Sequence, residues 1–180
     1  MTEREFELAC NKIMQGNRDG LKEIYSAYLP FIFAVIHNVL KNREDAEDVT
    51  TDFFIKLWSL AEKYRGGNGH KGWMATIARN MAIDYYRAHY REIPEENEIL
   101  ESAVSDTGAT SSHEEEIVSN QTIEEMLKKL NGGERQIVNM KVLGDMTFKE
   151  IAEVLKIPMG TVTWRYQNAI KKLRRCGYES

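Results

Sequence analysis

Residues 146–175, MTFKEIAEVLKIPMGTVTWRYQNAIKKLRR, have the pattern of two helices joined by a tight turn. Thr147 precedes an apolar helical pattern, and Glu150 follows three residues later, which is the spacing of a capping box. Pro158 cannot donate a hydrogen bond to a preceding turn and restricts Ile157, so we expect the first helix to end there. A second helix is predicted from about Gly160. This stretch therefore predicts a helix-turn-helix.

The second predicted helix has one apolar face and one polar, aromatic and basic face. No acidic residue occurs between Thr161 and Cys176. Amides that can recognise adenine, cations that suit guanine or phosphate, and hydroxyls near the helix start are what a helix in a DNA major groove needs. A helical hairpin with a solvated basic face is the alternative interpretation. The candidate DNA contacts are Thr161, Thr163, Trp164, Arg165, Gln167, Asn168 and Lys171.

Composition limits the class of protein. The chain has 180 residues, 42% of them apolar, with three prolines and no sustained strand-like alternation, so we expect an all-α fold. We find no apolar run of membrane-spanning length, and the charged N-terminus lacks the apolar core of a signal peptide. These features predict a soluble cytoplasmic protein without membrane insertion. Cys10 and Cys176 have no metal-type spacing, so we expect no metal site and no cofactor.

The charge is unevenly distributed along the chain. The net charge of −4 is unusual for a protein that binds nucleic acid, but residues 92–125 hold eleven acidic residues and no Lys or Arg. The rest of the chain has 24 basic and 17 acidic residues, a net charge of +7. Two basic blocks therefore flank an acidic segment, whose composition is typical of a linker. We expect two small helical domains, residues 1–91 and 114–180, joined by an acidic flexible linker over residues 92–113.

The N-terminal half contains one strongly acidic helical pattern that begins at Asn42. Ala46, Val49, Phe53, Leu57 and Leu60 would form its buried stripe. Acidic residues crowd its first half, which the helix dipole alone would explain. The functional alternative is a surface for a partner protein. The residues at its centre would be Asp48, Asp52, Phe53 and Lys56.

A glycine-rich loop over residues 65–70 precedes the segment KGWMATIARNMAIDYYRAHYR at residues 71–91. Trp73, Ile77 and Met81 would line one face of this helix. Basic residues alternate with tyrosines along the rest of it. Cations can hold phosphates while aromatic rings stack on bases, so the segment could hold a single strand of nucleic acid. An ordinary amphipathic helix with a buried tryptophan explains the same pattern.

These segments together resemble a known family, the bacterial RNA polymerase sigma factors of the extracytoplasmic-function (ECF) type in the sigma-70 family. EDAEDVTTDFFIKLW resembles the polymerase-binding helix of domain two, and YRGGNGHKGWMATIARNMAIDYYR resembles its promoter-melting segment. ERQIVNMKVLGDMTFKEIAEVLKIPMGTVTWR resembles domain four. The resemblance covers nearly the whole chain in the family's order. Trp164 departs from the small residue that the family often has there.

The resemblance implies a role for each matching residue. Asp48, Asp52 and Phe53 would contact the clamp coiled coil of core RNA polymerase, with Lys56 on the same surface. The −35 promoter element would lie against the outer face of the last helix. A partner, for example a membrane-bound anti-sigma factor, would regulate the protein by masking its polymerase-binding surfaces. The residues implied at the opened −10 element are Tyr64, Arg65, Trp73, Arg79, Asn80, Arg87 and Arg91.

Two other classes of function remain open from the residues alone. A conventional helix-turn-helix repressor or activator would use the N-terminal half as a sensor or dimerisation domain. Such a domain needs no basic and aromatic single-strand surface, which argues for the sigma factor. An enzyme, such as a metallohydrolase using His37, His70, His89 and His113, lacks ligand spacing and a nucleophile-base pair. We therefore expect no catalytic activity.

Overall fold

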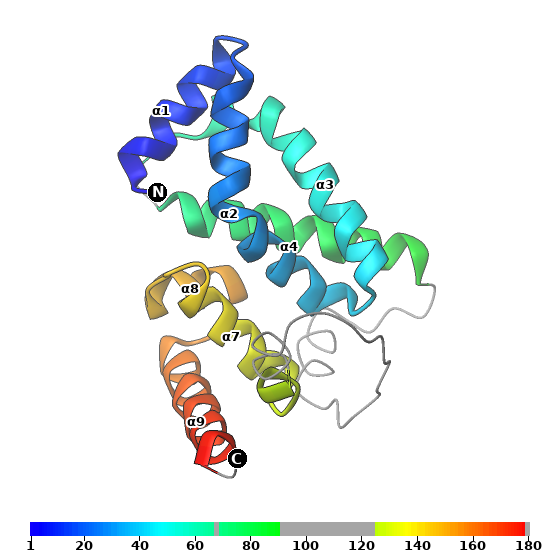
Figure 1. The fold of residues 1–180 in the computed structure, drawn as a ribbon, viewed down its shortest axis with the longest axis vertical. Coiled ribbons are helices and arrows are strands. Elements are labelled where there is room, and N and C mark those ends of the chain that lie inside the picture. The colour runs from blue at the N-terminus through cyan, green and yellow to red at the C-terminus, as the bar shows by residue number, and fades with distance from the viewer. Residues whose placement is uncertain (67–68, 91–124, 179–180) are drawn as a thin grey trace.

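The computed structural model describes residues 1–66, 69–90 and 125–178, and the described elements are all helices. The predicted linker at 92–113 and Arg91 lie outside the described residues. The N-terminal half contains four α-helices and one short 3₁₀ helix, and the C-terminal half ends in the helix-turn-helix (Figure 1). The elements are α1 (Glu3–Met14), α2 (Arg18–Leu40), α3 (Arg43–Leu60), η1 (Ala61–Lys63), α4 (His70–His89), α7 (Gly132–Val142), α8 (Phe148–Leu155) and α9 (Met159–Tyr178).

Side-chain caps set the starts of most of these helices. Thr2 and Glu5 form a capping box at α1, and Thr147 and Glu150 form the one predicted at α8. Asn42 caps α3 by accepting from the backbone N–H of Asp45. The all-α prediction and the predicted helix starts at Asn42 and Thr147 are confirmed. The predicted acidic helix ends at Leu60, where the short 3₁₀ helix η1 begins.

Helix α2 is the central element of the fold. It packs against α1, α3, α4 and α7. The helix continues through Pro30, and its axis changes direction about midway (Figure 1), the kink that proline imposes by removing one backbone donor. Contrary to the sequence prediction, α2 is long and apolar enough to cross a membrane, but half of that apolar stretch is buried in the fold. Its apolar residues are core residues, and we assign α2 as the core helix of the fold.

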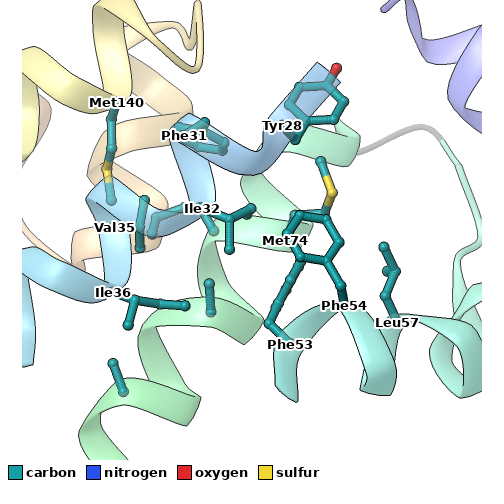
Figure 2. Packing of buried hydrophobic residues seen from close by; sticks show 14 of the residues in the cluster. Tyr28, Phe31, Ile32, Val35, Ile36, Phe53, Phe54, Leu57, Met74 and Met140 are labelled. Carbon is teal, nitrogen blue, oxygen red and sulfur yellow. The ribbon is translucent and has the colours of Figure 1, made fainter. Parts of the chain in front are cut away.

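The core between α2, α3 and α4 combines large and small side chains. Ile32 of α2 points toward Met74 of α4 and Phe53 of α3 (Figure 2). On α4 the most buried stripe is not Trp73, Ile77 and Met81 but a mostly small set. Alanines let the α4 backbone approach α2 closely, which leaves the larger side chains partly exposed at the edge. The fully buried members of that set are Met74, Ala75, Ala78 and Ala82.

The C-terminal half is built on α7, α8 and α9. Asn131 is the N-cap of α7, and its capping box with Glu134 makes Gly132 and Gly133 the first helical residues. Lys156 ends α8 in the left-handed conformation, and α9 begins right after Pro158. Val162 and Ala169 of α9 are fully buried. The helix-turn-helix is therefore confirmed.

The two halves share one continuous hydrophobic core. Helix α7 packs on α2, and α8 packs on α4 (Figure 1). Met140 of α7 points toward Phe31 and Val35 of α2 (Figure 2). At the rim of this contact, Lys71 Nζ lies 3.2 Å from the Asp145 carboxylate. The C-terminal half is therefore docked on the N-terminal half in this structure.

Candidate nucleic-acid and polymerase interfaces

The outer face of α9 carries the predicted duplex-DNA contacts. Val162 and Ala169 hold the opposite face in the core, so the helix can expose only the remaining side. Trp164 is 62% exposed although it is large and apolar, and Gln167 and Lys171 are exposed beside it. Arg165, Asn168 and Thr161 are partly exposed. Thr163 donates its hydroxyl to the carbonyl oxygen of Met159 at 3.0 Å, which leaves only its oxygen lone pairs for DNA.

Two neighbouring lysines of α9 have different surroundings. Lys172 Nζ lies 2.8 Å from both carboxylate oxygens of Glu134, a buried residue at the start of α7. This ion pair fastens α9 to α7, so Lys172 has a structural partner. Lys171 is exposed on the outer face. The helix therefore presents a positive outer face, and the ion pair between Lys172 and Glu134 holds the helix on α7.

Two partly exposed aromatic rings flank the loop before α4. Tyr64 follows η1 and Trp73 lies on the first turn of α4, and their ring centroids are 5.1 Å apart. Arg65 is exposed, and its guanidinium donates to the carbonyl oxygen of Glu62 at 2.7 Å. The structure thus brings together two aromatic rings that the sequence separates by a glycine-rich loop, and Arg65 directly follows the first of them. Such an aromatic pair beside a cation is suited to holding an unstacked base.

Further along α4 the predicted contacts divide by exposure. Asn80 and Arg87 are exposed. Arg79 is only 4% exposed and has interactions within the fold, so its side chain is not available to a phosphate in this structure. The sequence pattern does not predict this burial, because it places the buried face of α4 at Trp73, Ile77 and Met81, whereas the buried stripe includes Ala78, the neighbour of Arg79. Arg91 lies outside the described residues.

The end of α4 is tied to the start of α3 through Asp45. The Asp45 carboxylate accepts hydrogen bonds from Tyr85 at 2.9 Å and from Tyr90 at 2.6 Å. These bonds, with Tyr90 the stronger influence, hold the pKa of Asp45 below its ordinary value. Tyr85 also stacks on His89 at 3.9 Å between centroids. The sequence alone explains the acidic cluster by the helix dipole or by a partner protein, and nothing in the local pattern indicates a bond from Asp45 to a residue 40 positions away.

The acidic surface of α3 is exposed as predicted, with one exception. Asp48, Asp52 and Lys56 recur every four residues and lie on one exposed line of the helix. Phe53 is 1% exposed and packs in the core, so its side chain cannot be part of that surface. The structure adds Ile55, which is 65% exposed and lies seven residues from Asp48, on the same face. A single exposed isoleucine is common on protein surfaces, but here it adds apolar contact area to the acidic face.

The comparisons with known proteins agree with this division of the chain. Residues 24–92 match the family Sigma-70 region 2, and residues 120–173 match the family Sigma-70, region 4. The chain is 24% identical over 177 residues to the ECF RNA polymerase sigma factor SigW of Bacillus subtilis, covering 91% of this chain and 92% of that protein. It is 22% identical to the ECF sigma factor SigK of Mycobacterium ulcerans, covering 92% and 89% of the two chains.

Solved structures show the same fold. The sigma factor RpoE of Bartonella quintana, in complex with the anti-sigma factor NepR, aligns with a TM-score of 0.62 at 20% identity, covering 88% of this chain and 96% of that one. CnrH in complex with the cytosolic domain of CnrY aligns with a TM-score of 0.58 at 18% identity, covering 95% and 96%.

Region 2 followed by region 4, on this fold and with these exposed surfaces, places the chain in the sigma-70 family of RNA polymerase sigma factors. Within that family the chain is an ECF sigma factor. It directs promoter-specific initiation of transcription by RNA polymerase, and it is not a conventional repressor or activator.

Proposed function

We propose that the three surfaces divide the work of initiation, with α9 recognising the −35 element as duplex DNA. The observation that supports this is the exposure of Trp164, Gln167 and Lys171 on a helix without acidic residues. The Gln167 and Asn168 amides suit a bidentate contact with adenine, worth about 1–3 kcal/mol of discrimination. Lys171 suits a phosphate. Region 4 would thus supply base-specific contacts that need no strand opening.

The loop before α4 and the exposed side of α4 would hold the opened −10 element. Tyr64, Arg65 and Trp73 stand together at one end of this surface, while Asn80 and Arg87 continue it along the helix. Aromatic rings that stack on unpaired bases gain nothing from a closed duplex, so they favour the melted state. Arg79 is omitted from the surface because it is buried.

Core RNA polymerase would bind the exposed line of α3. Asp48, Asp52 and Lys56 supply charge complementarity, and Ile55 supplies apolar contact area. A protein that covered this surface would block initiation without touching DNA. The two solved structures most relevant here are sigma factors bound to anti-sigma proteins, which supports regulation of this chain by such a partner, whether membrane-bound or not. We propose a non-catalytic protein that acts in the cytoplasm.

Footprinting with permanganate separates the two DNA surfaces. Gln167→Ala or Asn168→Ala should weaken holoenzyme binding by roughly tenfold on a promoter with a good −35 element and change little on a poor one. Asn80→Ala should reduce opening of duplex promoters, with only partial recovery on a template whose −10 region is already unpaired. Asn11→Ala, an exposed amide on α1, is the matched control. Normal opening by Asn80→Ala, with loss on every template for the α9 variants, would contradict the assignment.

A further inference from the structure

Helix α1 lies outside the segment that matches Sigma-70 region 2, which begins at residue 24. Yet its first turn reaches the loop before α4. The Glu3 carboxylate accepts hydrogen bonds from the hydroxyl of Tyr64, from the backbone N–H of His70 at 3.2 Å, and from Nδ1 of His70 at 2.7 Å. Tyr64 is the residue before the loop, and His70 is the first residue of α4. One carboxylate therefore joins the two ends of the loop.

This carboxylate also replaces the missing cap of α4. Gly69 stands at the N-cap position and has no side chain to accept from the first backbone N–H groups. Glu3 accepts one of them, and its negative charge lies at the positive end of the α4 dipole. The start of α4, and with it Trp73 on the first turn, is thus positioned by a residue 67 positions earlier in the chain.

The imidazole of His70 makes the arrangement rigid. His70 is 3% exposed, and its ring lies between Glu3 and the hydroxyl of Tyr28 on α2. A carboxylate can only accept, so Nδ1 carries the proton that faces Glu3. Nε2 lies against the hydroxyl of Tyr28, which also donates to the carbonyl oxygen of Met1 at 3.1 Å. The ring therefore has one orientation in which both nitrogens meet a polar partner.

Aromatic packing connects α1 to the two rings of the proposed −10 surface. Phe6, one turn after Glu3, is fully buried. Its ring stacks on His70 at 4.6 Å and meets Tyr64 edge-on at 5.0 Å and Trp73 at 6.3 Å. Phe6 of α1 therefore packs against one side of both rings, and both rings remain partly exposed to solvent.

We propose that Glu3 is a positioning residue for recognition of the opened −10 element, acting through Tyr64 and His70 on the pair of rings formed by Tyr64 and Trp73. The inference rests on the proposed role of that pair. Glu3 itself does not touch DNA. It holds the ring of Tyr64 and the first turn of α4 so that the two rings, whose centroids are 5.1 Å apart, form one surface on which an unpaired base can stack.

The test uses the full chain in holoenzyme with core RNA polymerase, and measures the rate of promoter opening together with affinity for core polymerase. Glu3→Ala should slow opening on the order of tenfold or more, because it removes three hydrogen bonds to a charged acceptor. Glu3→Gln keeps an acceptor oxygen and should lose less. Affinity for core polymerase should be unchanged. Glu23→Ala is the matched control, because it removes the 2.6 Å pair with Lys12 that also holds α1 on α2, away from the loop.

A double-mutant cycle with Trp73→Ala distinguishes positioning from a general loss of stability. If Glu3 acts through the rings, Glu3→Ala should cost little further opening once Trp73 is already alanine. Equal losses in both backgrounds, or losses matched by Glu23→Ala, would overturn the inference. If Trp73→Ala itself left promoter opening unchanged, the proposed role of the Tyr64–Trp73 pair at the −10 element would be wrong. The positioning role of Glu3, which rests on that pair, would then be wrong as well.

The environment of Trp73 gives an independent readout if Glu3→Ala is poorly folded. With Trp58 and Trp164 replaced by phenylalanine, fluorescence reports only Trp73. Glu3→Gln should shift its emission and increase its quenching by iodide, while Glu23→Gln should not. An identical spectrum in both variants would contradict the positioning role even if opening were impaired.

Discussion

Trp164 is the residue that packing explains least. Most large apolar side chains in the described part of the chain are buried or lie at the edge of the core, but Trp164 is 62% exposed at the centre of the outer face of α9. Gly160, one turn earlier, has open space where a Cβ would be, so the indole does not fold back over the helix. In a major groove, an exposed apolar ring is suited to the methyl group of thymine.

Replacing thymines of the −35 element one at a time by deoxyuridine tests that role. Removal of a buried methyl costs about 0.8 kcal/mol, so at one or two positions wild-type holoenzyme should bind about fourfold more weakly. Trp164→Ala should not distinguish thymine from deoxyuridine at those positions. Trp58→Ala, a change of the same residue type on α3, is the control. Wild-type binding indifferent to every substitution would refute the methyl contact.

His70 makes the stability of the N-terminal half depend on pH. Burial is the main cause that lowers its pKa below 6.5, Lys71 and the N-terminus act in the same direction, and the Glu3 carboxylate opposes them. Because the pKa is lower in the folded than in the unfolded chain, the stabilisation is complete above about pH 6.5 and is lost as pH falls through the folded-state value. Between about pH 7.5 and pH 5.5, Tm should fall more for wild type than for His70→Gln. A steeper fall in the variant would contradict this sign.

At the scale of elements, local sequence patterns predicted where the helices lie. Contacts between residues far apart in the sequence determine which face of each helix is exposed. The caps at Thr2, Asn42 and Thr147 could be predicted because each bond spans three residues. Phe53 and Arg79 were placed on functional surfaces because a match to a sequence motif carries no information about whether a side chain is buried. The contact of Glu3 with His70 could not be predicted, since it depends on how α1 packs against α2 and the loop.

Helix α3 has the most direct test of a partner surface. Asp52→Arg reverses an exposed charge at the centre of the proposed polymerase contact and disturbs no core residue. We expect affinity for core RNA polymerase to fall on the order of tenfold, with unchanged circular dichroism and Tm. Glu153→Arg, an equal change on the exposed side of α8, should have no effect. Equal affinities for the two variants would remove α3 from the interface.

At the scale of the whole molecule, the proposed −10 and −35 surfaces lie too close together in the docked arrangement to reach both promoter elements at once. The −10 and −35 elements lie about 25 base pairs, or about 85 Å, apart along B-DNA at about 3.4 Å per base pair. Here α8 contacts α4 directly, so α9 and the Tyr64–Trp73 pair are far closer than that. The 34 residues at 91–124 could span at most roughly 110 Å if extended. On the proposed assignment of the two DNA surfaces, we therefore expect the C-terminal half to undock when the chain binds a promoter.

Gly144 is where the docking can be disturbed. A Cβ there would lie 2.6 Å from the carbonyl oxygen of Met140 and 2.6 Å from the ring of Phe31 on α2. Gly144→Ala should weaken docking by about 1–3 kcal/mol and increase the radius of gyration in small-angle X-ray scattering. Gly160→Ala, where a Cβ meets nothing within 4 Å, is the control and should leave the radius unchanged. An unchanged radius for Gly144→Ala would show that the contact does not depend on this close approach.

The central claim is that this chain opens promoters only together with core RNA polymerase, through two separate DNA surfaces. Run-off transcription with purified chain, core polymerase and a library of promoters measures this most directly. We predict transcripts only when both proteins are present, from a set of promoters that share a −10 and a −35 sequence. The −35 preference should change in Gln167→Ala, and the −10 dependence in Asn80→Ala. Tight sequence-specific binding of duplex DNA by the chain alone, without any transcript on adding core polymerase, would contradict the account.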